Sequence, residues 1–102
     1  MDIKKGYVVQ GKKHHRKRSK LYFVLKIKQS EGVLITAKMV MYDEPCKDNY
    51  LKINDGRNDI YFKYDHFSII SLDSVDVFFY KIKHSREIAS LIYEKHNEMK
   101  DK

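Results

Sequence analysis

The sequence predicts a mainly β domain that ends in one α-helix, and three observations predict it. Residues 21–28, LYFVLKIK, have a period of two, which is typical of a strand with one face on the core. One face carries Leu21, Phe23, Leu25 and Ile27, and the other carries Tyr22, Val24, Lys26 and Lys28. The aromatic residues, 13% of the chain, are Tyr and Phe beside many Val and Ile, a mixture that favours strands. From Ser85 the apolar spacing becomes helical. The 102 residues suit a single domain, 1–102.

The first half of the chain predicts three strands. Residues 6–10, GYVVQ, form a short β-type segment, and 21–28 and 33–41 form two longer ones joined by a turn at Ser30-Glu31-Gly32. Apolar side chains occur on both faces of 33–41, which is typical of a closed or strongly curved small barrel.

The second half predicts shorter strands and the helix. The strand segments are 50–53, 59–64, 68–72 and 75–82, with Asn54-Asp55-Gly56 as a strong turn signal. In the helix, about 85–100, Ser85 is the predicted N-cap, and Ile88, Leu91, Ile92 and Met99 form the stripe that packs on the barrel or on a second subunit. About six short antiparallel strands followed by one C-terminal α-helix predict a small SH3-like barrel.

The positive charge of the chain is concentrated in the stretch 11–20, GKKHHRKRSK. It supplies six of the seven net charges and contains no carboxylate. It has no hydrophobic periodicity, so we expect a long loop between the first two strands, and long hairpin loops are often functional. A concentrated basic patch is the usual footprint of a polyanion partner, most often nucleic acid, although a solvated surface loop is the simpler alternative. The predicted nucleic-acid-binding residues are Lys12, Lys13, Arg16, Lys17, Arg18, Lys20 and Lys38.

Cysteine usage and hydropathy indicate the compartment. Cys46 is the single cysteine, which excludes an intramolecular disulfide and suits a reducing interior. The N-terminus has no apolar signal-peptide region, and no apolar run approaches the length of a membrane span. We expect a cytoplasmic protein with no membrane partner.

Several short motifs resemble the MazF/PemK toxins, including their ToxN-like relatives. The motifs are Gly6-Tyr7-Val8-Val9, the basic stretch with 21–27, the strand 33–39, and Ser68-Ile69-Ile70-Ser71-Leu72-Asp73-Ser74-Val75. The family's Arg-Pro pair is absent before 21–27, and Asp76 occupies the position of a common Arg. The resemblance implies an SH3-like barrel, a homodimer, and a ribonuclease held inactive by an antitoxin of protein or RNA. Apolar residues on both faces of 33–41 offer a dimer interface.

The basic stretch contains the residue types that metal-independent RNA cleavage needs. That reaction requires a base near the ribose 2′-hydroxyl, cations at the phosphate and an acid at the leaving oxygen. The candidate catalytic residues are His14, His15, Arg16 and Arg18, with Thr36 or Lys38 as a supporting donor. A pair of histidines in a basic loop is also a common passive phosphate-contacting surface.

Other chemistry has weaker signals. The remaining histidines are too scattered for a metal site, no carboxylate cluster accompanies the basic stretch, and no Gly-rich phosphate loop occurs, so we predict no metal and no cofactor. Tyr7, Tyr22 and Tyr42 have the chemistry to stack on unpaired bases, although strand aromatics are more often core residues. The leading hypothesis is an endoribonuclease acting on single-stranded RNA. The alternatives are a non-catalytic nucleic-acid-binding module and a phage- or defence-related protein that docks its basic loop on an acidic protein.

Overall fold

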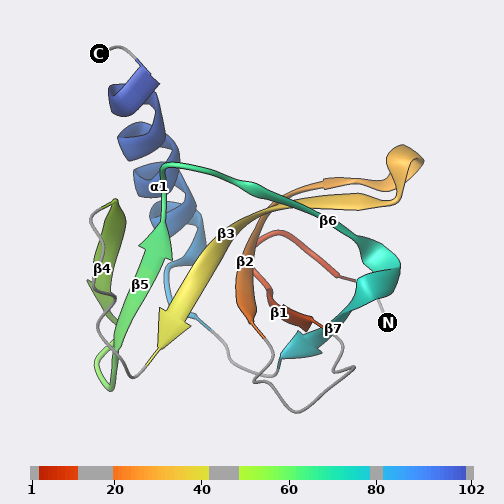
Figure 1. Cartoon of the computed structure of the whole chain (residues 1–102). Helices are drawn as coiled ribbons and strands as arrows, with labels where there is room; N and C mark the ends of the chain where they lie inside the picture. The colour runs from red at the N-terminus through yellow and green to blue at the C-terminus, as the bar shows by residue number, and fades with distance from the viewer. Residues whose placement is uncertain (1–2, 12–19, 42–48, 79–81, 101–102) are drawn as a thin grey trace.

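The computed structural model describes residues 3–11, 20–41, 49–78 and 82–100, and it confirms a mainly β chain with a C-terminal helix (Figure 1). Within these ranges the chain forms seven strands and one α-helix: β1 (Val8–Gly11), β2 (Leu21–Lys28), β3 (Val33–Met41), β4 (Tyr50–Asn54), β5 (Asp59–Lys63), β6 (Ser68–Ser71), β7 (Val75–Phe78) and α1 (Ser85–Lys100). Each predicted strand segment therefore corresponds to an observed strand, and residues 79–81 of the predicted segment 75–82 lie outside the described ranges. Among the described residues, no helix is both long enough and apolar enough to cross a membrane.

All strand pairs in the sheet are antiparallel, in the order β4-β5-β3-β2-β1-β7, and β6 also pairs with β3. The long strand β3 has β2 along one edge. On its other edge it pairs first with β6, through Val33–Thr36, and then with β5, through Met39–Met41. Strand β3 therefore holds the two parts of the sheet together.

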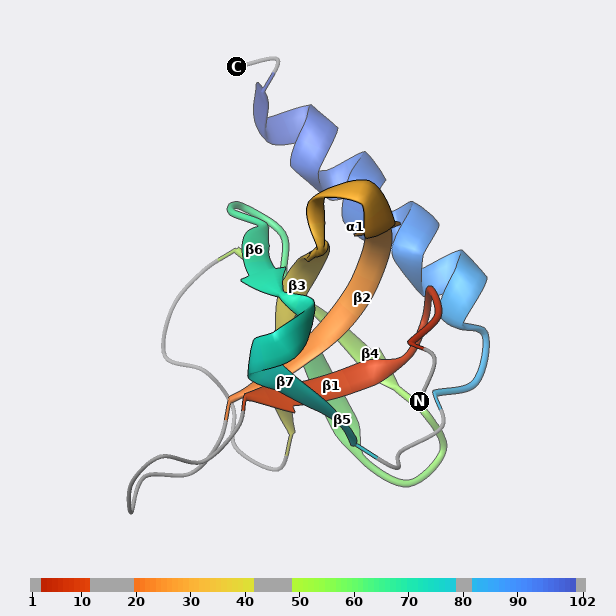
Figure 2. The ribbon, with the colours of Figure 1, turned by 90° about the vertical axis from the view of Figure 1, so that its right-hand side faces the viewer.

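The connection between β6 and β7 shows that the sheet is curled. Strands β6 and β7 lie at opposite ends of the order β6-β3-β2-β1-β7, which in a flat sheet would separate them by about 19 Å. They are joined by a single 3₁₀ turn, Leu72–Ser74, which rises only about 6 Å. Figure 2 shows this turn above β7 and β1. Because the described pairings contain no ladder between β6 and β7, full closure of the barrel stays a prediction.

The hairpin between β4 and β5 forms at the predicted turn. Gly56 has φ +96°, the left-handed region that glycine occupies without strain. Its N–H donates to Asn54 Oδ1 at 2.8 Å, and Asp55 Oδ1 accepts from the N–H groups of Arg57 and Asn58 at 2.9 Å. Local hydrogen bonds by Asn and Asp therefore fix this turn.

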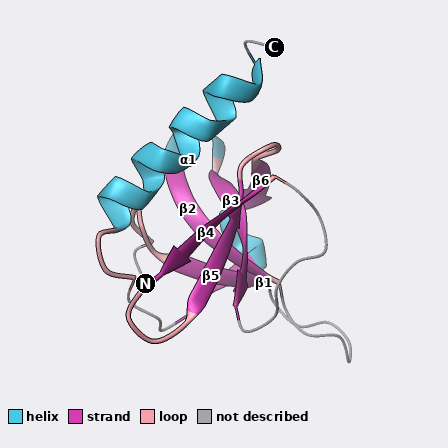
Figure 3. Cartoon of the chain, turned by 90° about the vertical axis from the view of Figure 1, so that its left-hand side faces the viewer, coloured by secondary structure: helices cyan, strands magenta, loops and turns pink. Residues whose placement is uncertain are grey.

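The larger of two hydrophobic clusters lies between the sheet and α1. Figure 3 shows the helix lying diagonally across one side of the sheet. Phe23 of β2 and Phe62 of β5 meet edge to face at the centre of this cluster, with ring centroids 5.1 Å apart. Its buried members are Val8, Phe23, Leu25, Ala37, Met39, Met41, Ile60, Phe62, Ile82, Ile88 and Ile92.

The smaller cluster lies on the opposite face of β1, β2 and β3, inside the curl. Its buried members are Val9, Val24, Leu34 and Val75, with Ile70 and Leu72 packed against them. The prediction that 21–28 has one face on the core is therefore wrong, because Val24 is fully buried on the other face. A bulge between Val24 and Lys26 also changes the alternation, so that Ile27 packs on the smaller cluster.

The helix begins and packs slightly differently from the prediction. Ser85 is the first helical residue and the first helical bond runs from Ile88 N–H to His84 O at 3.0 Å, so His84, not Ser85, occupies the cap position. Ile88 and Ile92 are buried as expected, but Leu91 is 40% exposed and Met99 is 39% exposed. Leu91 lies on the flank of the stripe, and the last turns of α1 extend past the sheet (Figure 1).

Candidate nucleic-acid interface

The basic stretch starts and ends at one point of the sheet. Strands β1 and β2 pair through Gln10 and Leu21, and beyond them Gly11 N–H donates to Lys20 O at 3.2 Å. Gly11 also pairs with Val75 at the start of β7. The predicted hairpin with a long connection is therefore confirmed. The connection begins at Gly11 and ends at Lys20, where β1, β2 and β7 meet.

Most of the predicted site residues lie between Gly11 and Lys20 in the sequence, outside the described residues. They are Lys12, Lys13, His14, His15, Arg16, Lys17 and Arg18. Their binding and catalytic roles stay predictions. Tyr42 and Cys46 also lie outside the described ranges.

Two cations and a tyrosine share one face of the sheet beside the point where the basic stretch begins and ends. Tyr22 pairs with Val9 on one side and with Lys38 on the other. Because residues two apart in a strand share a face, Lys20 lies on the same face as Tyr22. Lys20 is exposed, whereas Tyr22 and Lys38 are half-buried and Tyr22 packs against the smaller cluster. The predicted binding residues Lys20 and Lys38 are therefore brought together next to the basic stretch.

Thr36, a predicted supporting donor, is fully buried. Its side chain is 0% exposed, and its hydroxyl donates to Ser68 O at 3.0 Å. Thr36 and Ser68 are also partners in the ladder between β3 and β6. The hydroxyl therefore joins the two strands, and a role for it at a phosphate stays a prediction.

The described histidines are His66, His84 and His96, which lie outside the basic stretch in the sequence. His66 and His84 are exposed, whereas the His96 ring stacks on Phe67 with centroids 4.2 Å apart. His96 Nδ1 lies 2.7 Å from Tyr64 O, and because a carbonyl only accepts, Nδ1 carries the proton. His96 thus fixes α1 to the connection between β5 and β6. Within the described ranges no three His, Cys, Asp or Glu side chains gather as metal ligands.

A second basic feature is a groove of about 430 Å³, formed where the residues before β1, the bulge of β2 and the start of α1 meet. Figure 2 shows the chain before β1 beside the first turn of α1. The polar side chains of its lining are three cations and three hydroxyls, and the lining contains no carboxylate: Lys5, Lys26, Arg86, Ser85, Ser90 and Tyr93. We call it the Lys5–Lys26–Arg86 groove.

Gly6 allows the segment before β1 to lie close to the first turn of α1. Its N–H donates to Val24 O at 2.9 Å, and its φ is +85°. A Cβ at this position would lie 2.7 Å from Ser85 Oγ and 3.0 Å from Ser85 Cβ, so that the Ser85 side chain or the backbone would have to shift. A residue other than glycine would therefore meet both backbone strain and a steric clash.

Tyr93 supplies a neutral phenol at the groove. A phenol with the ordinary pKa of 10.0 is protonated at neutral pH, and burial raises the pKa of Tyr93 further. The edge of its ring contacts Phe67, with centroids 5.7 Å apart and planes at 86°. The phenol is therefore a positioned hydrogen-bond donor.

Sequence reasoning missed the Lys5–Lys26–Arg86 groove, because its cations come from segments far apart in the chain. Lys5 precedes β1, Lys26 lies in β2 and Arg86 lies in the first turn of α1. The one local signal was Gly6, which was assigned to the start of a strand.

Comparisons with known proteins identify no relative. No family model, no curated protein and no solved structure matches this chain.

Proposed function

We propose that this protein binds single-stranded RNA through the basic stretch and the face that carries Lys20, Tyr22 and Lys38. The hairpin anchored at Gly11 and Lys20 carries this proposal, because the stretch between these residues supplies six cations, Lys20 included, and Lys38 adds a seventh from the neighbouring strand β3. Cations bind phosphates, and a half-buried tyrosine beside them has the chemistry to contact an unpaired base.

We further propose that the bound RNA is cleaved without a metal ion, as in toxin-like endoribonucleases neutralised by an antitoxin. A histidine, His14 or His15, takes the proton of the 2′-hydroxyl, and the oxygen attacks phosphorus. The bond from phosphorus to the 5′-oxygen breaks, and an acid returns a proton to that oxygen. The products are a 2′,3′-cyclic phosphate and a 5′-hydroxyl, and Arg16 or Arg18 balances the charge that develops on the phosphate.

A non-catalytic RNA-binding module is the second candidate, and the position of Thr36 favours it. The Thr36 hydroxyl, predicted to support the reaction, is buried and bound to Ser68 O. In this alternative the same basic stretch binds RNA, and the histidines only contact phosphates.

Cleavage is tested with purified protein, a long RNA and EDTA, followed by mapping of the new ends. The expected result is 2′,3′-cyclic phosphate ends, with single-turnover cleavage slowed about 10²–10⁴-fold in His14→Ala or His15→Ala and binding retained. A DNA strand of the same sequence is the control and should stay intact, because it lacks the 2′-hydroxyl. RNA binding without cleavage under any condition would establish the binding module instead. Binding to an acidic protein with no affinity for RNA would contradict both proposals.

The homodimer stays a prediction, and the chain itself covers part of the expected interface. Of the apolar residues of β3 that were expected to meet a partner, Leu34, Ala37, Met39 and Met41 are buried within the chain, whereas Val33, Ile35 and Val40 are half-buried. Light scattering at micromolar concentration measures whether a dimer forms.

A further inference from the structure

We propose that the Lys5–Lys26–Arg86 groove is a second phosphate-binding site, which holds a phosphodiester of the bound RNA strand. This inference rests on the proposed function, because it adds a contact for the same ligand. The ligand chemistry is a phosphate oxyanion, and the experiment below separates RNA phosphate from free phosphate.

The three cations of the groove are not neutralised by ion pairs with described residues. None of Lys5, Lys26 and Arg86 forms an ion pair there. Other described lysines do: Lys28 pairs with Glu31 at 3.7 Å, and Lys52 pairs with Asp59 at 3.8 Å. Three cations that converge on one groove repel one another, and an anion between them removes that repulsion.

Neutral donors complete the site. The hydroxyls of Ser85, Ser90 and Tyr93 border the same groove, and the Tyr93 phenol stays protonated for the reason given above. The first helical bond is accepted by His84 O, so the N–H groups of Ser85, Arg86 and Glu87 have no acceptor within the helix. Cations, hydroxyls and amides in one place match the acceptor oxygens of a phosphate.

The position of the groove suits a strand that is also held by the basic stretch. Gly6 borders the groove and Gly11 is where the basic stretch begins, so the two sites are separated by five residues of β1 and the turn before it, about 17 Å. Small barrels that bind single strands cover about 4–16 nucleotides, which is long enough to span this distance. Because Tyr22 packs on the smaller cluster, on the face opposite α1, such a strand would pass from one face of the sheet to the other.

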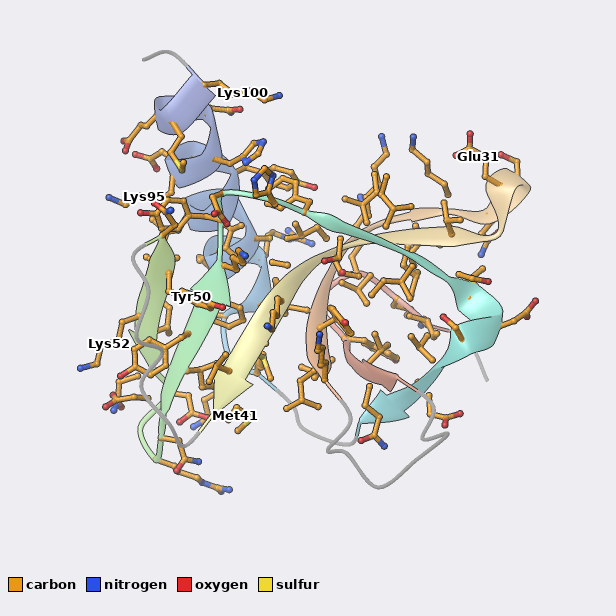
Figure 4. The ribbon with its side chains drawn as sticks, viewed as in Figure 1. Glu31, Met41, Tyr50, Lys52, Lys95 and Lys100 are labelled. Carbon is orange, nitrogen blue, oxygen red and sulfur yellow. The ribbon has the colours of Figure 1, made fainter. Side chains whose placement is uncertain are left out.

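The test compares two triple variants that lose the same charge. The groove variant is Lys5→Ser, Lys26→Ser and Arg86→Ser, and the control is Lys28→Ser, Lys52→Ser and Lys95→Ser. Each control lysine is exposed and paired to a neighbouring carboxylate, and Figure 4 shows Lys52 and Lys95 pointing outward from β4 and α1. Circular dichroism melting shows whether both variants are folded.

Binding of a fluorescent single-stranded RNA is measured across a salt series. Loss of three phosphate contacts should lower the slope of log affinity against log salt by about 2 in the groove variant, and the control should stay near the wild type. Equal slopes in the two variants would overturn the proposal while leaving the proposed function in place.

A second arm titrates inorganic phosphate into isotope-labelled wild-type protein and follows amide resonances. Shifts at Gly6, Arg86 and Tyr93 that disappear in the groove variant support the phosphate site by a measurement independent of RNA. Wild-type protein that binds phosphate here but no RNA would contradict the proposed function and the RNA part of this inference. Absence of shifts together with an unchanged salt slope would remove the site altogether.

Discussion

The first 41 residues and the remaining 61 differ sharply in charge. The first region contains β1, β2 and β3 and carries eleven Lys and Arg against two carboxylates. The second region contains β4 to β7 and α1 and carries ten Lys and Arg against twelve carboxylates. The basic character of the chain therefore belongs to its first three strands and the stretch between them.

The two regions also use their cations differently. In the second region Lys52, Lys63 and Lys95 form ion pairs with nearby carboxylates. In the first region Lys28 pairs with Glu31. Exposed pairs of this kind contribute little to stability, about 0–1 kcal/mol, but they neutralise a surface.

The larger hydrophobic cluster contains residues from both regions. Phe23 and Val8 of the first region pack with Phe62, Ile88 and Ile92 of the second in the larger cluster. We therefore expect stability to depend on both regions and RNA binding on the first, with Arg86 as the contribution of the second.

The largest effect on stability is expected where the two regions meet. Phe62→Ala removes a fully buried ring that packs on Phe23 and should lower the free energy of unfolding by about 3–5 kcal/mol. RNA affinity should stay unchanged at temperatures where the variant is folded. Urea denaturation measures the loss, and Ile69→Ala, at a site 71% exposed, is the control and should cost less than about 0.5 kcal/mol. Loss of RNA affinity in folded Phe62→Ala protein would contradict the expectation that RNA binding depends on the first region alone, apart from Arg86.

A smaller effect is expected where the N-terminal segment meets α1. Gly6→Ala should cost about 1–3 kcal/mol, because φ is +85° and the new Cβ would meet Ser85 Oγ. Gly11→Ala is the matched control, since its Cβ would have no neighbour within 4 Å. Thermal melting of both variants distinguishes them, and equal melting temperatures would refute the close contact.

A loss of about 1 kcal/mol is expected for Thr36→Val, because the hydroxyl that donates to Ser68 O is removed. Thr36→Ser keeps the hydroxyl and should recover the hydrogen bond while losing a buried methyl. If the role of Thr36 is only structural, cleavage and RNA affinity stay unchanged in folded Thr36→Val protein. A fall in cleavage that Thr36→Ser restores would instead support the predicted catalytic role.

The smallest effect is expected at high pH. The pKa of Tyr93 is about 10.0 in the unfolded chain and higher in the fold because of burial, so the folded state holds the proton more tightly. The contribution of the protonated Tyr93 hydroxyl to folding stability is complete below pH 10 and is lost as the pH rises above 10. Tyr93→Phe should therefore lose less stability between pH 9 and pH 11 than the wild type, as urea midpoints would show. Identical pH profiles would indicate that burial does not perturb this phenol.

Most of the fold could be predicted from the sequence because its signals are local. Alternation predicted β2 and β3, Asn54-Asp55-Gly56 predicted a turn that its own side chains stabilise, and helical spacing predicted α1. Burial on each face could not be predicted in the same way. The bulge after Val24 changes which side of β2 faces which cluster, and such a bulge depends on pairing with β3.

The candidate site was predicted only in part. The basic stretch is contiguous in sequence, so its charge is visible there, and the pairing of β2 with β3 places Lys38 opposite Tyr22, two residues after Lys20. The Lys5–Lys26–Arg86 groove depends on three segments that only the folded chain brings together. The burial of Thr36 likewise follows from its pairing with β6, which no local pattern reveals.

The most direct test of the account is the salt dependence of RNA binding in two variants that each lose six positive charges. One replaces Lys12, Lys13, Arg16, Lys17, Arg18 and Lys20 of the first region by Ser, and the other replaces Lys52, Arg57, Lys63, Lys83, Lys95 and Lys100 of the second. The account predicts that the first variant lowers the log–log slope for single-stranded RNA by up to about 4, while the second keeps a slope close to that of the wild type. Equal losses in both variants would contradict it, because binding would then follow the net charge of the chain and not the basic stretch.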